Sequence, residues 1–152
     1  MEETWDGLPV SPEPPYGAAV LVWARTPTGP LFLLLHRAHL ESPDARDWAW
    51  GPPAGARLPG EEIAACAQRE LREETCLEAE IAPTEFGTPD WEVYGVELAV
   101  SGPVVLSEEH DRFLWATVAD VRALVWPDRV QVSLVRLAET LADSDGAARR
   151  GQ

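Results

Sequence analysis

Short, almost wholly apolar runs alternate with turn-forming residues along much of the chain. Residues 17–25 (GAAVLVWAR) and 31–37 (LFLLLHR) flank a turn segment, TPTGP, at 26–30. Two apolar runs joined by a Gly/Pro turn are typical of a β-hairpin. Residues 91–100 (WEVYGVELAV) and 112–118 (RFLWATV) predict two further strands in the second half of the chain.

Helical patterns lie between and after these strands. Residues 61–75 (EEIAACAQRELREET) predict the clearest helix, because they combine strong helix formers with acids at the start and contain neither Gly nor Pro. Asp120 predicts the cap of a short helix, and residues 130–142 predict a C-terminal helix. The element order β-β-loop-α-β-β-β-α indicates an α/β fold in the broad sense (α+β, with a mixed sheet). The helices are expected to pack on that sheet.

The length of 152 residues suits one compact domain. We expect that domain to span residues 17–142. Residues 1–16 hold four prolines among polar and acidic residues, which predicts an extended N-terminal arm, and residues 143–152 predict a C-terminal tail.

The net charge of −14, from 26 acidic and 12 basic residues, argues against binding to polymeric nucleic acid, which needs a basic surface. A small anionic substrate remains compatible if a metal ion inverts the local field. No apolar run approaches the ~20 residues of a membrane span, and the N-terminus lacks the features of a secretory signal. We therefore expect a cytoplasmic protein with no membrane partner, in which Cys66 and Cys76 are reduced thiols.

Glu70, Glu73 and Glu74 recur at i, i+3 and i+4 and so share one face of the predicted helix. Like charges at this spacing destabilise a helix by roughly 0.2–0.5 kcal/mol per pair, and a bound cation would relieve the repulsion. Clustered oxygen ligands suit Mg²⁺ or Mn²⁺. The alternative is a solvated acidic face, partly neutralised by Arg69 and Arg72.

A Gly/Pro-rich loop, WGPPAG at 50–55, leads into this helix, and loop and helix together resemble the Nudix box, G-x5-E-x7-R-E-U-x-E-E-x-G-U. The matching positions are Gly55, Glu61, Arg69, Glu70, Leu71, Glu73, Glu74 and Leu77. Cys76 replaces the last Gly, and we expect the turn after the helix to differ slightly, because a left-handed Cys costs about 1 kcal/mol. The resemblance covers roughly residues 17–142 and implies a Nudix-type α/β/α sandwich.

The resemblance implies a metal site. Glu70 and Glu74 would be the principal Mg²⁺ ligands, with Glu73 on the same ion or a second one, and the Ala54 carbonyl would complete the protein's share. Mn²⁺ is an alternative cation. His110 is expected to steady an acidic loop and not to bind metal.

The resemblance also implies catalytic roles. Arg69 would orient Glu70 or pair with Glu61, next to the Gly55 turn. Glu70 and Glu109 are both candidates for the general base that takes a proton from water, with Glu108 as a substitute for Glu109. The alternative reading of that acidic loop is a solvated turn.

Arg37 ends a predicted strand, where its guanidinium could pair with a substrate phosphate. Four aromatic residues could stack on a base or serve as packing anchors, and among them we select Trp50 as the candidate for substrate binding; they are Trp48, Trp50, Trp91 and Tyr94. Segments 31–37, 48–55 and 106–115 resemble asymmetric diadenosine tetraphosphate hydrolases. The last of these segments and the predicted C-terminal helix also resemble those of dihydroneopterin triphosphate pyrophosphatases.

The resemblance implies a Mg²⁺-dependent hydrolase that cleaves a diphosphate (phosphoanhydride) linkage in a nucleoside di- or triphosphate derivative by attack of water at phosphorus. Its partner would be a small nucleotide-like molecule, and the sequence leaves a homodimer open. One alternative is a catalytically silent Nudix-fold module that binds or senses a nucleotide, and another is a structural protein with an acidic surface helix.

Overall fold

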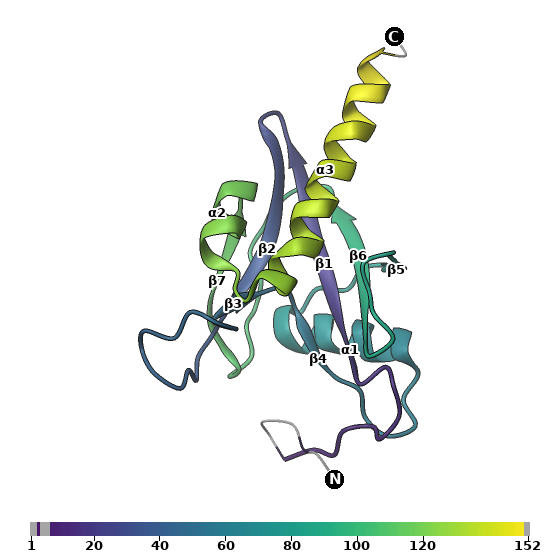
Figure 1. Cartoon of the computed structure of the whole chain (residues 1–152), viewed down its shortest axis with the longest axis vertical. Helices are drawn as coiled ribbons and strands as arrows, with labels where there is room; N and C mark the ends of the chain where they lie inside the picture. Colours follow the sequence, from purple (N-terminus) through teal and green to yellow (C-terminus); the bar gives the residue numbers. More distant parts are fainter. Residues whose placement is uncertain (1–2, 4–6, 151–152) are drawn as a thin grey trace.

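The computed structural model describes residue 3 and residues 7–150, the side chains of 145–150 excepted, and is built around one mixed sheet (Figure 1). The strands are β1 (Gly17–Thr26), β2 (Gly29–Arg37), β3 (Trp50–Gly51), β4 (Ala54–Ala56), β5 (Ala82–Pro83), β6 (Trp91–Leu98) and β7 (His110–Ala116). The helices are α1 (Ile63–Thr75), α2 (Val118–Leu124) and α3 (Asp128–Arg150). The strand order is β3-β2-β1-β6-β5, with β4 paired to β1 and β7 paired to β2.

Strand β1 lies at the centre of the sheet. It forms the predicted antiparallel hairpin with β2 and pairs in parallel with β6, from Gly17 opposite Trp91 to Ala24 opposite Leu98. Parallel neighbours need a long crossover connection, and here that connection contains α1. The predictions of a hairpin and of a mixed sheet are confirmed.

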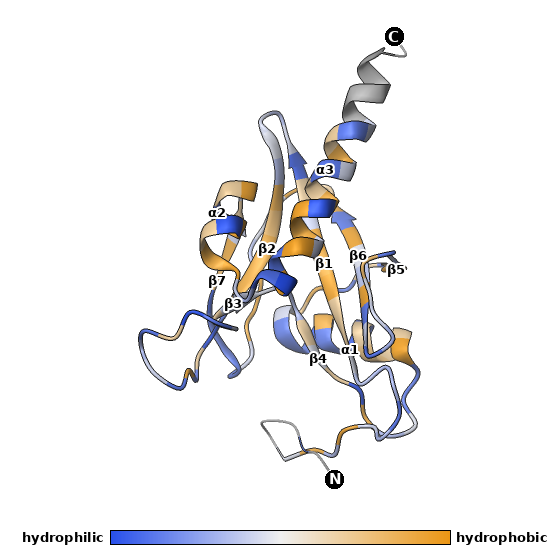
Figure 2. Ribbon diagram, viewed as in Figure 1, coloured by the Kyte–Doolittle hydropathy of each residue, from blue (hydrophilic) through white to orange (hydrophobic). Residues whose placement is uncertain are grey.

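Both faces of the sheet are covered. Along β1, Val20 and Val22 join a core beneath α1, whereas Leu21 joins a second core beneath α2 and α3. Successive strand residues point to opposite faces, so the helices must lie on opposite sides. Figure 2 shows the centres of β1 and β2 in the orange of apolar residues, and the long loop after β2 mostly in blue. The predicted α/β/α sandwich is confirmed.

Helix α1 begins at Ile63, later than its sequence pattern predicts. Glu62 is the N-cap residue with extended backbone, so no acid lies in the first turn. The Glu61 carboxylate does not cap the helix. It accepts hydrogen bonds from the Leu58 amide at 3.1 Å and from Arg69 at 2.8 Å.

The last two helices also differ from the prediction at their ends. Thr117, not Asp120, caps α2; the Thr117 hydroxyl accepts from the Asp120 amide at 3.1 Å, and the Asp120 carboxylate accepts from the Thr117 amide at 3.0 Å. Helix α3 starts at Asp128 and runs to Arg150 without a proline to end it, and its end projects beyond the sheet (Figure 1). In the described part of the chain, no helix combines the length and apolar character of a membrane span.

The described part of the N-terminal arm lies against the loop that precedes α1. The Ser11 amide donates to the Arg57 carbonyl at 2.7 Å, and the Arg57 guanidinium donates to the Glu13 carbonyl at 2.7 Å. Val10 and Ser11 are buried in this part of the arm. The arm therefore packs against the loop that leads into α1 and is hydrogen-bonded to it.

Candidate active site

Helix α1 carries the three clustered acids, and the fold buries only two of them. Glu70 and Glu74 are 8% and 2% exposed, whereas the Glu73 side chain is 54% exposed. Glu73 forms an i, i+4 ion pair with Arg69 at 3.2 Å. Glu70 and Glu74 are thus directed into the protein, and Glu73 lies at the solvent edge of the same helix.

Glu70 packs directly against the backbone of Gly55 in β4. A Cβ atom at position 55 would lie 2.1 Å from the Glu70 carboxyl carbon, so a larger residue would displace the carboxylate. Burial raises the pKa of Glu70 to about 7, while the charge of Arg69 acts in the opposite direction. Glycine at position 55 is therefore needed for Glu70 to approach β4 this closely. This contact explains why the first position of the Nudix box is a glycine.

Arg69 ties the helix to the loop before it. Its Nε and Nη2 donate to the two Glu61 oxygens at 2.8 and 2.9 Å, and its Nη1 donates to Glu70 at 2.9 Å. Nη2 also donates to the Ala56 carbonyl at 3.0 Å. The hydrogen bond from Arg69 lowers the pKa of Glu61, which keeps that carboxylate charged. Arg69 thus holds Glu70 and Glu61 in fixed positions.

Glu74 is the most deeply buried acid of the site. Its Oε2 accepts a hydrogen bond from the Ala54 amide at 3.0 Å, and its Oε1 lies 4.0 Å from Nδ1 of His110. Burial raises the pKa of Glu74 well above its ordinary value, and the charges of Glu109 and Glu70 raise it further. The amide of Ala54 thereby fixes one oxygen of Glu74 and leaves the other directed at the loop before β7.

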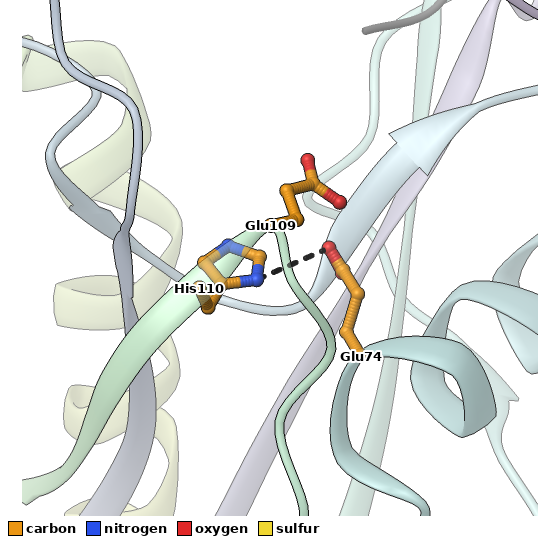
Figure 3. Close-up of side chains that lie close together, drawn as sticks. All are labelled: Glu74, Glu109 and His110. Carbon is orange, nitrogen blue, oxygen red and sulfur yellow. Dashed lines mark ion pairs between the residues drawn. The ribbon is translucent and has the colours of Figure 1, made fainter. Parts of the chain in front are cut away.

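That loop brings Glu109 and His110 to α1 (Figure 3). The Ala38 amide donates to the Glu109 carbonyl at 2.9 Å. In the antiparallel pairing of β2 with β7, His110 lies opposite Arg37, the last residue of β2. One ligand atom each from Glu74, Glu109 and His110 lie within 4.8 Å of one another. Burial lowers the pKa of His110 to about 4. Segments far apart in sequence therefore meet at one acidic centre.

The structure distinguishes the two acids of this loop. Glu108 is exposed and lies outside the group formed by Glu74, Glu109 and His110. His110, for which no metal role is expected from the sequence, lies inside it. The three histidines of the chain have no spacing typical of a metal site, so the sequence carries no signal for this position.

Cys76 adopts the left-handed conformation that favours glycine, with φ 58° and ψ 15°. Its amide donates to the Arg72 carbonyl at 2.8 Å and closes the last turn of α1. The adjacent Thr75 hydroxyl accepts from the Leu77 amide at 3.1 Å, which continues the turn. The expectation that cysteine would alter this turn is wrong, because these hydrogen bonds hold the backbone in the glycine conformation.

Trp50 lies on β3 and packs against the core beneath α2 and α3. Its ring meets His36 edge-on at 4.9 Å, and the Arg112 guanidinium carbon lies 5.8 Å from the ring centre. Two further aromatic candidates also make contacts within the fold: Trp91 lies over Gly17, and Tyr94 is buried in the core beneath α1. Each of these three rings therefore contacts other residues of the fold.

Arg37 connects the acidic centre to a pocket. Its charge acts on Glu74 and His110, and its side chain lines a pocket of about 510 Å³ formed largely by the loop after β2. Trp48 lines the same pocket, is 42% exposed, and has a positive φ of 67°. Strained non-glycine residues gather at binding and catalytic sites. Trp48, not Trp50, is thus the tryptophan beside Arg37.

Comparison with known proteins identifies the family. The NUDIX domain model matches residues 15–135. The fold is similar to an Ap4A hydrolase of C. elegans (TM-score 0.66, 23% identity, 84% of this chain and 98% of that one) and to RenU, a Nudix hydrolase of M. smegmatis (0.66, 22%, 93% and 93%). It is also similar to the dihydroneopterin triphosphate pyrophosphohydrolase of E. coli (0.64, 17%, 87% and 99%). No curated protein sequence matches this chain. The family match spans most of the chain and includes the acids of α1 with the Gly55 turn, and the chain therefore belongs to the Nudix family.

Proposed function

We propose that this Nudix-type hydrolase cleaves a phosphoanhydride linkage in a small nucleotide-like molecule by attack of water at phosphorus, and that it needs a divalent cation, Mg²⁺ or Mn²⁺. The observation that carries the proposal is the burial of Glu70 and Glu74, with Glu109 close to Glu74. Buried carboxylates close to one another are unfavourable as neighbouring anions, and a divalent cation compensates their charge.

The residues present fit such a cation. The donors are mostly oxygens, as Mg²⁺ and Mn²⁺ prefer, and the glycine at 55 allows Glu70 to approach the backbone of β4. Glu70, Glu74 and the Ala54 carbonyl would hold the ion, with Glu73 at the solvent edge. When bound, the ion would neutralise negative charge on the diphosphate oxygens.

The attacking water must lose a proton to a carboxylate. Glu70 is one candidate, because burial brings its pKa to about 7, close to neutral pH. Glu109 is the other, because it lies at the end of a loop and faces Glu74 (Figure 3). Arg69 supports the first role by holding Glu70 against Gly55.

The pocket beside Arg37 would receive the rest of the substrate. A guanidinium binds phosphate oxygens through two parallel hydrogen bonds, and Arg37 lies where the acidic centre meets the pocket. Trp48 on the pocket wall would stack on a planar heterocycle. Trp50, selected from the sequence, would then support the neighbouring strand without touching substrate.

Incubation with Mg²⁺ and a substrate panel tests the proposal. The panel contains diadenosine tetraphosphate, dihydroneopterin triphosphate, oxidised dGTP and ADP-ribose. We expect turnover of at least one compound, loss of that turnover in Glu74→Gln, and normal turnover in Glu78→Gln, which alters an exposed acid just beyond α1. Glu74→Gln activity within tenfold of wild type would contradict the ligand assignment. Tight binding of a panel member without any cleavage would instead indicate a silent binding module.

A further inference from the structure

His110 has a buried ring nitrogen without a hydrogen-bond partner. The residue is 9% exposed, and in the described part of the chain its Nδ1 atom neither donates nor accepts a hydrogen bond. Buried polar atoms in proteins almost always have a partner, and an exception is often explained by a ligand or ion. The nearest acidic atom is Glu74 Oε1, at 4.0 Å.

The surroundings of this nitrogen are those of a ligand site. Figure 3 shows the His110 ring directed at the Glu74 carboxylate from β7, with Glu109 beside both. The Ala54 amide occupies the other Glu74 oxygen, so Oε1 is the oxygen that faces His110. The backbone is held on both sides, by the bond from Ala38 to the Glu109 carbonyl and by the pairing of His110 with Arg37. Fixed backbone positions favour a preorganised site.

We infer that Nδ1 of His110 joins Glu74 Oε1 and a Glu109 carboxylate oxygen as ligands of one divalent transition-metal ion. This inference deepens, and rests on, the proposed metal-dependent hydrolysis. Donor atoms at about 2.1 Å from a shared ion lie at most ~4.2 Å apart. One ligand atom from each of the three residues already lies within 4.8 Å of the other two, and Nδ1 of His110 lies 4.0 Å from Glu74 Oε1, so a side-chain shift of under about 1 Å brings them into range.

A nitrogen ligand changes which cation the site prefers. Imidazole binds Co²⁺ and Zn²⁺ readily; Mn²⁺ favours oxygen ligands but accepts an imidazole more readily than Mg²⁺, which demands oxygen ligands and keeps much of its water. A site made of two carboxylates and one histidine therefore favours Mn²⁺ over Mg²⁺ more than carboxylates alone would. Replacement of His110 should weaken Mn²⁺ binding about tenfold or more and leave Mg²⁺ binding nearly unchanged.

Pulsed EPR of the full chain loaded with Mn²⁺ tests the inference without relying on activity. We expect a nitrogen coupling from a directly bound imidazole, which changes to the ¹⁵N pattern when the protein is made with ¹⁵N-histidine. The coupling should disappear in His110→Gln and His110→Ala and persist in His39→Gln, the control histidine in the loop after β2. Calorimetric titration then compares the affinities for Mn²⁺ and Mg²⁺.

The outcomes separate this inference from the proposed function. Bound Mn²⁺ without histidine coupling in the wild-type protein overturns the His110 assignment and leaves the hydrolase proposal standing. Failure of both Mn²⁺ and Mg²⁺ to bind overturns both. A wild-type spectrum without histidine coupling overturns the assignment by itself, so the inference can be refuted even if a His110 variant folds poorly.

Discussion

Gly55 and Glu70 lie so close together that a single added Cβ atom would occupy the space of the carboxyl group, at 2.1 Å from its carbon. The two residues come from different elements, β4 and α1, and lie fifteen positions apart in the sequence. Their contact fixes where the buried carboxylate lies relative to the sheet, and therefore where any cation bound by Glu70 lies.

Gly55→Ala should displace Glu70 and impair both stability and turnover. Forcing an extra methyl group into a packed contact costs about 1–3 kcal/mol of unfolding free energy. Turnover should fall at least a hundredfold, because the carboxylate of Glu70 is displaced from its position beside β4. Urea unfolding and steady-state kinetics measure the two effects. Gly51→Ala is the control, since a Cβ there meets no atom within 4 Å; equal losses in both variants would refute the steric explanation.

The buried acids predict an unusual pH dependence of the metal-free protein. Burial raises the pKa of Glu70 from 4.5 to about 7. Over that interval the folded state holds more protons than the unfolded state, so the free energy of unfolding falls as the pH rises from about 4.5 to 7. Glu74 shifts in the same direction.

Glu70→Gln should remove part of this decrease in the free energy of unfolding between pH 4.5 and 7, on the order of 2 kcal/mol. Urea unfolding in a chelator at several pH values measures it. Saturating Mg²⁺ should reverse the trend in the wild-type protein, because carboxylates bind metal only when deprotonated. A parallel pH profile for Glu70→Gln and wild type without metal would show that Glu70 is not the responsible group.

Arg69→Lys should reduce turnover about ten- to a hundredfold, the usual effect of losing a residue that orients a metal ligand. Lysine keeps the charge but replaces a planar fork with one point of contact, so it loses the paired bonds to Glu61 and the bond to Glu70. Arg72→Lys, an exposed change on the same helix, is the matched control.

Glu61 and Arg69, which are joined by these paired hydrogen bonds, should act as a unit. Glu61→Gln is expected to lower turnover as well, and the double variant should lose little more than the worse single variant. Multiplied effects in the double variant would instead indicate that Glu61 and Arg69 contribute independently.

Local patterns in the sequence predict the hairpin of β1 and β2 and the existence of α1, because burial follows the two- and 3.6-residue periods. The α/β/α sandwich is implied by the resemblance to the Nudix family and not by these local patterns. The end of α1 illustrates where local rules fail: the preference of Cys76 against a left-handed backbone is overridden by the bonds that close the turn.

Contacts between distant segments set the remaining details of the site. Nothing in the residues around His110 indicates that its nitrogen lies near Glu74, since that depends on how the loop before β7 is fastened to β2. For the same reason Trp48 and Trp50 look alike in the sequence, although only Trp48 lines the pocket beside Arg37.

Cys76→Gly should stabilise the protein, in contrast to most substitutions at a helix end. An L-residue in the left-handed conformation costs about 1–2 kcal/mol, and the greater freedom of glycine in the unfolded chain offsets about 0.5–1 kcal/mol of the gain. A net increase of about 0.5–1 kcal/mol in unfolding free energy is therefore expected from urea titration. Cys76→Ala retains the strained backbone and serves as the control. If both variants shift stability equally, the exposed thiol, and not the backbone conformation, is responsible.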